Sequence, residues 1–269
     1  MQHILVMPMS DPRGDLFSLL EPIRADLKAI FTRAYLGVIP ANPNLDDPFF
    51  NPVAIPAGQP VGEQFKLLFT SAAALEPPDA VLHLCFIDRV SFALQTTHQA
   101  AFLADLRAIQ EEDLPLLFLR SPAAWQTHPQ NYREIEEMAT QLGRWVLGKT
   151  LDFAWCHLVI RAGQLREIIN EVHNTDLTIL AEMLLQIHGT IKTKAVDWLA
   201  WEDPFILGRP AAELKREREE SRDETRKRLG YILPTLQILC TRGQVFIGRL
   251  QAEQVDLPRQ EELDEPWEE

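Results

Sequence analysis

The stretch GEQFKLLFTSAAALEPPDAVLHLCFID, residues 62–88, decides the expected fold. It begins at Gly62 with a predicted helix that ends near Leu75, and a turn that contains two prolines follows. Residues 80–87 are nearly all apolar, which predicts a central strand covered on both faces of its sheet. Asp88 comes directly after that strand. The stretch therefore predicts a helix, a buried strand, and a carboxylate at the strand's carboxyl end.

The same alternation of helices and strands extends to both sides of this unit. Apolar and β-branched runs predict further strands, and apolar residues at helical spacing predict helices between them. The expected strands are 3–9, 35–39, 114–119, 153–160 and 190–196, and the expected helices are 15–31, 102–109, 131–147, 163–172 and 177–187. This order predicts an α/β fold with a mostly parallel sheet and helices on both faces. In such sheets ligands bind at the carboxyl ends of the strands.

Three parts of the chain differ in composition. Residues 1–207 carry the alternation and are expected to form one domain, in which 40–60, rich in Pro, Asn and Asp, is a long loop. A dense mixed-charge run and a more apolar stretch after it predict a C-terminal helical arm over 208–252. This arm packs back on the domain or on a second subunit, which would make a homo-oligomer. Residues 253–269 are acidic and predict a disordered tail.

Charge and cysteine content exclude several classes of partner. The 269-residue chain has a net charge of −13, whereas a general nucleic-acid or anionic-membrane binder is usually basic, so no nucleic-acid partner is expected. No uncharged apolar run approaches the roughly 20 residues of a transmembrane helix. Three separate cysteines and an amino terminus without a basic lead favour a reducing, cytoplasmic location. P-loop, GxSxG, GxGxxG and HExxH motifs do not occur.

A first candidate site follows the first strand, in residues 7–14. The backbone around Pro8 and Ser10 can hold a nucleotide base or ribose. Asp11 can accept a hydroxyl, and Arg13 can meet a phosphate through two hydrogen bonds. The alternative is a plain turn between a strand and a helix.

A second candidate site lies in residues 62–88. The helix that begins at Gly62, with Lys66 in its first turns, offers an amino terminus that can bind an anion. Asp88 can hold a divalent metal that bridges a diphosphate. The alternatives are an ordinary helix start for Gly62, and a strand-end cap or an ion pair with Arg89 for Asp88.

The order of these elements resembles nucleotide-sugar glycosyltransferases of the GT-A type. A first strand ending in a Pro-containing loop, a Gly-led helix and an apolar strand ending in Asp88 are similar to their donor half. Leu117 to Ser121, with Arg120, is similar to the strand that follows the donor site, and the likeness covers about residues 3–205. Dolichol-phosphate mannose synthases and glucosyl-phosphoglycerate synthases are the nearest comparison.

The chain differs from this family at the family's metal-binding motif, Asp-x-Asp. This chain has Asp88-Arg89-Val90, so the second carboxylate is missing. The resemblance implies Mg²⁺ or Mn²⁺ at Asp88, weakened by this loss. It also implies a late ligand in a segment where the family often uses His, and Asp197, Glu202 or Asp203 can take that place, with Asp203 as the chosen candidate. Arg89 can replace metal charge by direct contact with the diphosphate. The alternative is a protein that has lost catalysis and only binds a ligand.

In the resemblance, the later elements of the chain correspond to the half of the protein that binds the acceptor hydroxyl. Asp152, Asp176 and Glu182 are candidates for the base that takes the proton of the attacking hydroxyl. Trp155, His157 and Trp201 can stack on a sugar or hydrogen-bond to it, and the alternative for each is packing inside the protein.

Two functions therefore stay open. The first is transfer of a sugar from a nucleotide-diphospho-sugar to a hydroxyl acceptor, itself a small molecule or a sugar. The second is a catalytically degenerate GT-A-like protein that acts as a nucleotide-binding or oligomeric interaction module. The missing second Asp favours the latter.

Overall fold

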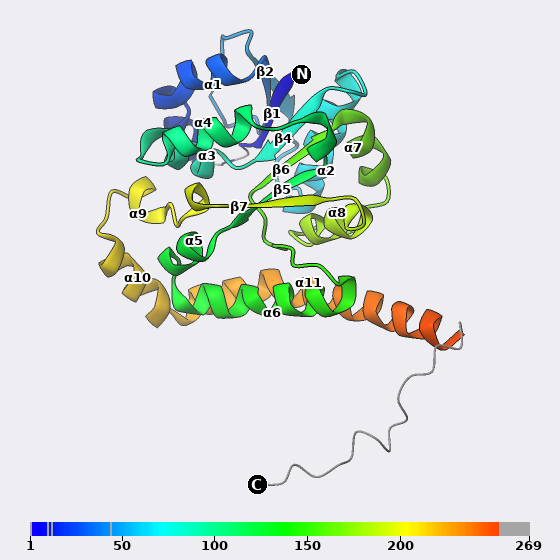
Figure 1. Cartoon of the computed structure of the whole chain (residues 1–269). Coiled ribbons are helices and arrows are strands. Elements are labelled where there is room, and N and C mark those ends of the chain that lie inside the picture. The colour runs from blue at the N-terminus through cyan, green and yellow to red at the C-terminus, as the bar shows by residue number, and fades with distance from the viewer. Residues whose placement is uncertain (1, 10, 12, 44, 253–269) are drawn as a thin grey trace.

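The structure of the chain is a computed structural model that describes residues 2–9, 11, 13–43 and 45–252 (Figure 1). Of residues 243–252 it describes the backbone alone. The expected acidic tail, 253–269, and the candidate Ser10 lie outside the described residues.

A mostly parallel sheet of seven strands forms the centre of the described part of the chain. The strands are β1 (His3–Pro8), β2 (Arg33–Val38), β3 (Phe50–Ala54), β4 (Val81–Cys85), β5 (Leu116–Arg120), β6 (His157–Arg161) and β7 (Lys192–Val196). Their order is β3-β2-β1-β4-β6-β5-β7. Only β6 runs antiparallel to its neighbours, β4 and β5. The predicted α/β class, with a central β4 whose residues are all buried, is confirmed.

Helices cover both faces of this sheet, and the residues of β1 show why. Ile4 and Val6 point into one hydrophobic cluster, and Leu5 and Met7 point into the other. Successive side chains of a strand point to opposite faces, so a continuously apolar strand needs cover on both. One face carries α2 (Val61–Leu75), α7 (Ala162–Ile169) and α8 (Ile179–Ile187), and the other carries α1 (Arg24–Ile30), α3 (Ile87–Gln95) and α4 (Gln99–Arg107).

One sequence prediction about the fold was wrong. The expected loop over 40–60 contains β3, which pairs in parallel with β2. β3 includes Asn51 and Pro52, which are typical of loops, and only its first residue, Phe50, is buried. β3 lies at the edge of the sheet, where a proline is tolerated because one side of the strand needs no ladder hydrogen bonds. Composition alone therefore concealed this strand.

The C-terminal helices pack on the rest of the chain. They are α10 (Ala211–Glu220) and α11 (Arg222–Ala252), which runs alongside α6 (Gln130–Leu147) in the same direction (Figure 1). The Tyr132 hydroxyl donates to Glu224 over 2.6 Å, and Arg228 contacts Glu136 at 2.8 Å. Ile232 of α11 is buried in the hydrophobic cluster beneath. Helix α11 thus packs on α6 and on the hydrophobic cluster, and contact with a second subunit, the other expectation, stays a prediction.

Among the described residues, no helix has the length and apolar character that crossing a membrane requires.

Candidate functional site

A cavity of about 380 Å³ opens at the carboxyl edge of the sheet. It lies beside the end of β4 and the start of β6, which meet there because the two strands are antiparallel. Apolar side chains form one part of its lining and charged side chains form the other. The lining residues are Phe86, Asp88, Arg89, Glu136, Phe153, Ala154, Trp155, Cys156, Leu177, Leu180, Glu202, Arg228, Tyr231, Ile232 and Thr235. The cavity therefore lies at the carboxyl ends of the strands, where ligands bind in sheets of this kind.

Asp88 lies in the first turn of α3, just past the end of β4. Its carboxylate accepts the backbone N–H of Arg89 over 2.8 Å and has no ion pair among the described residues. Burial raises the pKa of Asp88 from its ordinary value. Val90 is 1% exposed and packs into the hydrophobic core under α3. Residue 90 therefore has a packing role, since a helix turns it away from the direction of Asp88.

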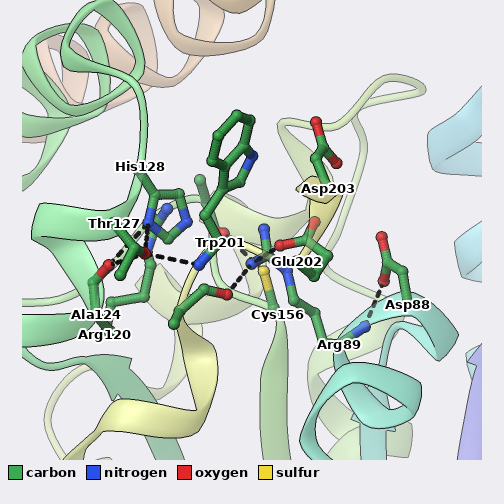
Figure 2. Close-up of polar contacts among 12 residues, drawn as sticks. Asp88, Arg89, Arg120, Ala124, Thr127, His128, Cys156, Trp201, Glu202 and Asp203 are labelled. Carbon is green, nitrogen blue, oxygen red and sulfur yellow. Dashed lines mark hydrogen bonds and ion pairs between the residues drawn. The ribbon is translucent and has the colours of Figure 1, made fainter. Parts of the chain in front are cut away.

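Arg89 is held by Glu202 from the segment that follows β7. The guanidinium forms an ion pair with Glu202 and donates to the backbone oxygen of Ala200 over 3.0 Å (Figure 2). Glu202 is 5% exposed, and burial raises its pKa to about 8 in spite of the opposing charge of Arg89. Arg89 and Glu202 both line the cavity, so their ion pair forms part of its charged wall.

Arg120, the residue at the end of β5, has far more partners. Its guanidinium donates to both carboxylate oxygens of Asp152, over 2.8 and 2.7 Å, and contacts Glu136 at 2.7 Å. The ring of Trp125 covers it, 3.7 Å from the guanidinium carbon. Glu136 also binds Arg228, so this network ties β5 to α6 and α11. These contacts occupy most of the guanidinium of Arg120, so little of it can bind a ligand.

His128 and Cys156 lie between the two arginines in Figure 2. Nδ1 of His128 bonds the backbone oxygen of Ala124 over 3.0 Å, and Nε2 has no partner among the described residues. Burial lowers the pKa of His128 to about 2, so the ring is neutral. Burial likewise raises the pKa of Cys156 to about 11, so a thiol and not a thiolate faces the cavity.

The predicted nucleoside loop after β1 does not line this cavity. Asp11 accepts the backbone N–H groups of Arg13, over 3.0 Å, and Leu16, over 2.9 Å, and so closes the turn itself. Arg13 is exposed and pairs with Asp15 at 2.9 Å. Pro8 ends β1 at the same edge of the sheet as the cavity. The contacts are those of the plain-turn alternative, and the nucleoside role stays a prediction.

Backbone groups of residues 172–176 contact the first turns of α2, where an anion site was predicted. The N–H of Gly62 donates to the backbone oxygen of Thr175 over 2.9 Å, and a Cβ on Gly62 would come within 2.5 Å of the oxygen of Asp176. Lys66 donates to the oxygen of Val172 over 2.7 Å. Glycine is thus needed here because two backbone segments approach closely.

The three predicted bases lie outside the cavity lining. Asp152 is paired with Arg120, and Asp176 accepts the backbone N–H of Thr178 over 2.8 Å. Glu182 accepts the N–H groups of His173, over 2.9 Å, and Asn174, over 2.8 Å. Each carboxylate therefore stabilises a local segment.

The predicted sugar-binding aromatics are buried. Trp155 lines the cavity but is 1% exposed, and its indole N–H donates to the oxygen of Leu180 over 2.9 Å. His157 faces the other side of the sheet, where it hydrogen-bonds to His83 over 3.1 Å. Trp201 is buried, and its backbone N–H donates to Thr127 over 2.7 Å. The packing alternative describes His157 and Trp201 well.

Asp203, the second predicted metal ligand, is brought toward Asp88. The two carboxylates are close enough for Asp203 to help raise the pKa of Asp88, and both appear around Glu202 in Figure 2. Asp203 also approaches Arg218 of α10 at 3.7 Å. Among the described residues, no group of three or more His, Cys, Asp or Glu side chains could hold a metal by itself.

The sequence did not predict that the C-terminal helix α11 lines the cavity. Arg228, Tyr231, Ile232 and Thr235 of α11 line the cavity, with Glu136 of α6. They recur at helical spacing, and that spacing was the available signal. It could not show which part of the domain the helix would cover.

Comparisons with protein-family models and with curated proteins found no match to this chain.

Proposed function

We propose that this chain is a glycosyltransferase of the GT-A type, which transfers a sugar from a nucleotide-diphospho-sugar to a hydroxyl acceptor in the carboxyl-edge cavity. The observation that carries the proposal is the meeting of Asp88, Arg89 and Glu202 in one cavity. These residues come from two distant segments, and the cavity lies where a mostly parallel sheet binds its ligands.

The charge of the lining indicates what kind of diphosphate complex fits. Asp88, Glu136 and Glu202 outnumber Arg89 and Arg228 among the described lining residues. Both arginines are already paired with carboxylates of the protein. A bare diphosphate would therefore be repelled, whereas a diphosphate carrying a divalent cation would bring positive charge toward Asp88.

The residues present fit such a cation. Asp88 is a carboxylate without an ion pair among the described residues, and Asp203 lies near it. Mg²⁺ is commonly bound through one or two carboxylates together with substrate phosphates and water, so three protein ligands are not required. When bound, the cation would neutralise the charge that develops on the leaving nucleotide.

The chain's own residues would position the reactants. Arg89, fixed by Ala200 and Glu202, presents its guanidinium beside the diphosphate. Glu202 faces the same cavity and is placed to accept the proton of the acceptor hydroxyl. Phe86 and Trp155 in the apolar part of the lining would exclude water from the reaction.

A calorimetric titration tests the proposal. The full chain is titrated with UDP-glucose and GDP-mannose, with and without Mn²⁺, and Asp88→Asn is compared with Asp79→Asn, an exposed acid that keeps the same charge change. The proposal expects Mn²⁺-dependent binding that Asp88→Asn abolishes and Asp79→Asn retains. Absence of binding for every nucleotide sugar in Mn²⁺ would contradict it.

A second candidate is a catalytically degenerate module that binds a ligand without turnover. The pairing of Arg89 and Arg228 with protein carboxylates favours it, because each arginine already has a structural partner. Binding of a nucleotide sugar without release of nucleoside diphosphate, in the presence of varied hydroxyl acceptors, would distinguish it from the transferase.

A further inference from the structure

A second cavity, of about 300 Å³, lies under α1 and α4 beside the amino-terminal end of β1. Its described lining shares no residue with the carboxyl-edge cavity. Its volume is at the lower end of the roughly 300–1,000 Å³ that is typical of small-molecule sites. A ligand here would have to be small, and it would bind independently of the proposed nucleotide site.

The walls of this cavity combine an apolar surface with two opposite charges. The apolar surface is formed by Ile30, Phe31, Leu103 and Leu106. Asp26 of α1 and Arg107 at the end of α4 also line it.

Asp26 and Arg107 are not paired with one another or with any other described residue. No ion pair within 4.0 Å and no side-chain hydrogen bond involves either of them in the described part of the chain. A carboxylate and a guanidinium that flank one cavity without meeting can each bind the opposite charge on a ligand.

Two histidines, His3 and His83, line the same cavity, and a third, His157, continues their line of hydrogen bonds. Nδ1 of His3 lies 2.8 Å from Nε2 of His83, and Nδ1 of His83 lies 3.1 Å from Nε2 of His157. Each neutral imidazole has one donor and one acceptor, so the line satisfies both ring nitrogens of the fully buried His83. The contact with His83 leaves Nε2 of His3 as the imidazole atom that can meet a ligand at the cavity.

We propose that this cavity binds an apolar α-amino acid. The ammonium group would pair with Asp26, the carboxylate would pair with Arg107 and hydrogen-bond to His3, and the apolar side chain would pack on Phe31 and Leu106. A zwitterion fits because it carries one charge for each of the two unpaired groups. A ligand with one charge would pair with only one of them.

Titration calorimetry on the full chain tests this assignment with L-leucine and L-phenylalanine as probes. 3-Phenylpropionate lacks the ammonium group, and 2-phenylethylamine lacks the carboxylate. Asp26→Asn and Arg107→Gln are each expected to weaken phenylalanine binding about tenfold to a hundredfold, the loss typical of a charged hydrogen bond. Glu167→Gln and Arg144→Gln remove the same charges from exposed positions on other helices and should leave binding unchanged.

The two single-charge probes make the test specific. Wild type should bind phenylalanine more tightly than either probe, and Asp26→Asn should lose its preference for phenylalanine over 3-phenylpropionate. Failure of both amino acids to bind would overturn the proposal. So would binding that neither Asp26→Asn nor Arg107→Gln changes, or equal affinity for phenylalanine and 3-phenylpropionate in the wild type.

Discussion

Arg120 is the last residue of β5 and Arg89 lies in the first turn of α3, just past β4, so both are at the same edge of the sheet, yet the protein holds them differently. Arg120 contacts two carboxylates and an aromatic ring, and its side chain is 3% exposed. Arg89 contacts one carboxylate and one backbone oxygen, and both it and that carboxylate line the cavity. The same residue type at a strand end thus holds several elements together in one case and lines a cavity in the other.

The number of partners, and not the position at a strand end, therefore distinguishes the two arginines. Removing one partner of a buried ion pair destabilises a protein, because a charge is left without compensation. Removal of Arg120 would leave Asp152 without its ion pair and Glu136 with Arg228 alone, whereas removal of Arg89 would leave Glu202, whose pKa is already raised.

The largest expected effect is that of Arg120→Leu. Loss of the guanidinium leaves Asp152 and Glu136 buried without it, which should lower the free energy of unfolding by about 3–5 kcal/mol. Urea denaturation at neutral pH measures this. The exposed control Arg144→Leu should change stability by about 0.5 kcal/mol or less. A loss near that of the control would show that the network is not structural.

Arg89→Met should cost less, about 1–3 kcal/mol at pH 7. Glu202 then loses its ion pair, and because the charge of Arg89 lowers the pKa of Glu202, the carboxyl should stay protonated even above about pH 8, its pKa in the wild type. The cost should therefore grow as the pH rises from 7 to 9, because the wild-type carboxyl ionises beside Arg89 in that range and the variant's does not. The double variant Arg89→Met, Glu202→Gln should remove that pH dependence, and its persistence would contradict the assignment to Glu202.

Gly62→Ala tests the close packing at the start of α2, where Gly62 meets the backbone of residues 175 and 176. A methyl group there meets backbone of residues 175 and 176 that cannot move aside easily, and about 1–3 kcal/mol of stability should be lost. Gly230→Ala, with open space around it inside α11, should be neutral or slightly stabilising. Thermal unfolding followed by circular dichroism compares the two.

Buried neutral histidines predict a loss of stability in acid. Burial lowers the pKa of His157 to about 3 and of His128 to about 2, and it also lowers that of His83. The unfolded chain binds these protons near pH 6.5, so the stabilisation is complete above 6.5 and falls below it. Each histidine should contribute about 1.4 kcal/mol per pH unit. His128→Phe should flatten the slope between pH 6.5 and 5, whereas the exposed His173→Gln should not.

The sequence predicted those parts of the fold whose signal is local. The apolar run that forms β4 and the helical spacing of α2 were sufficient for both elements. β3 was missed because its strand conformation depends on pairing with β2, whereas its own composition is typical of a loop. In the site, the carboxylate at residue 88 was predictable from its place after a buried strand. The pairing of Arg89 with Glu202, more than 100 residues away, depends on how β4 and β7 are arranged in space.

Hydrogen–deuterium exchange of the full chain tests most directly whether the carboxyl-edge cavity is the ligand site. The exchange of wild type and Asp88→Asn is compared with and without UDP-glucose or GDP-mannose in Mn²⁺. Ligand binding at this cavity should slow exchange in residues 86–89 and 200–203 of the wild type, with no such change in Asp88→Asn. Unchanged exchange in both segments of the wild type, with either nucleotide sugar, would contradict the placement of the site.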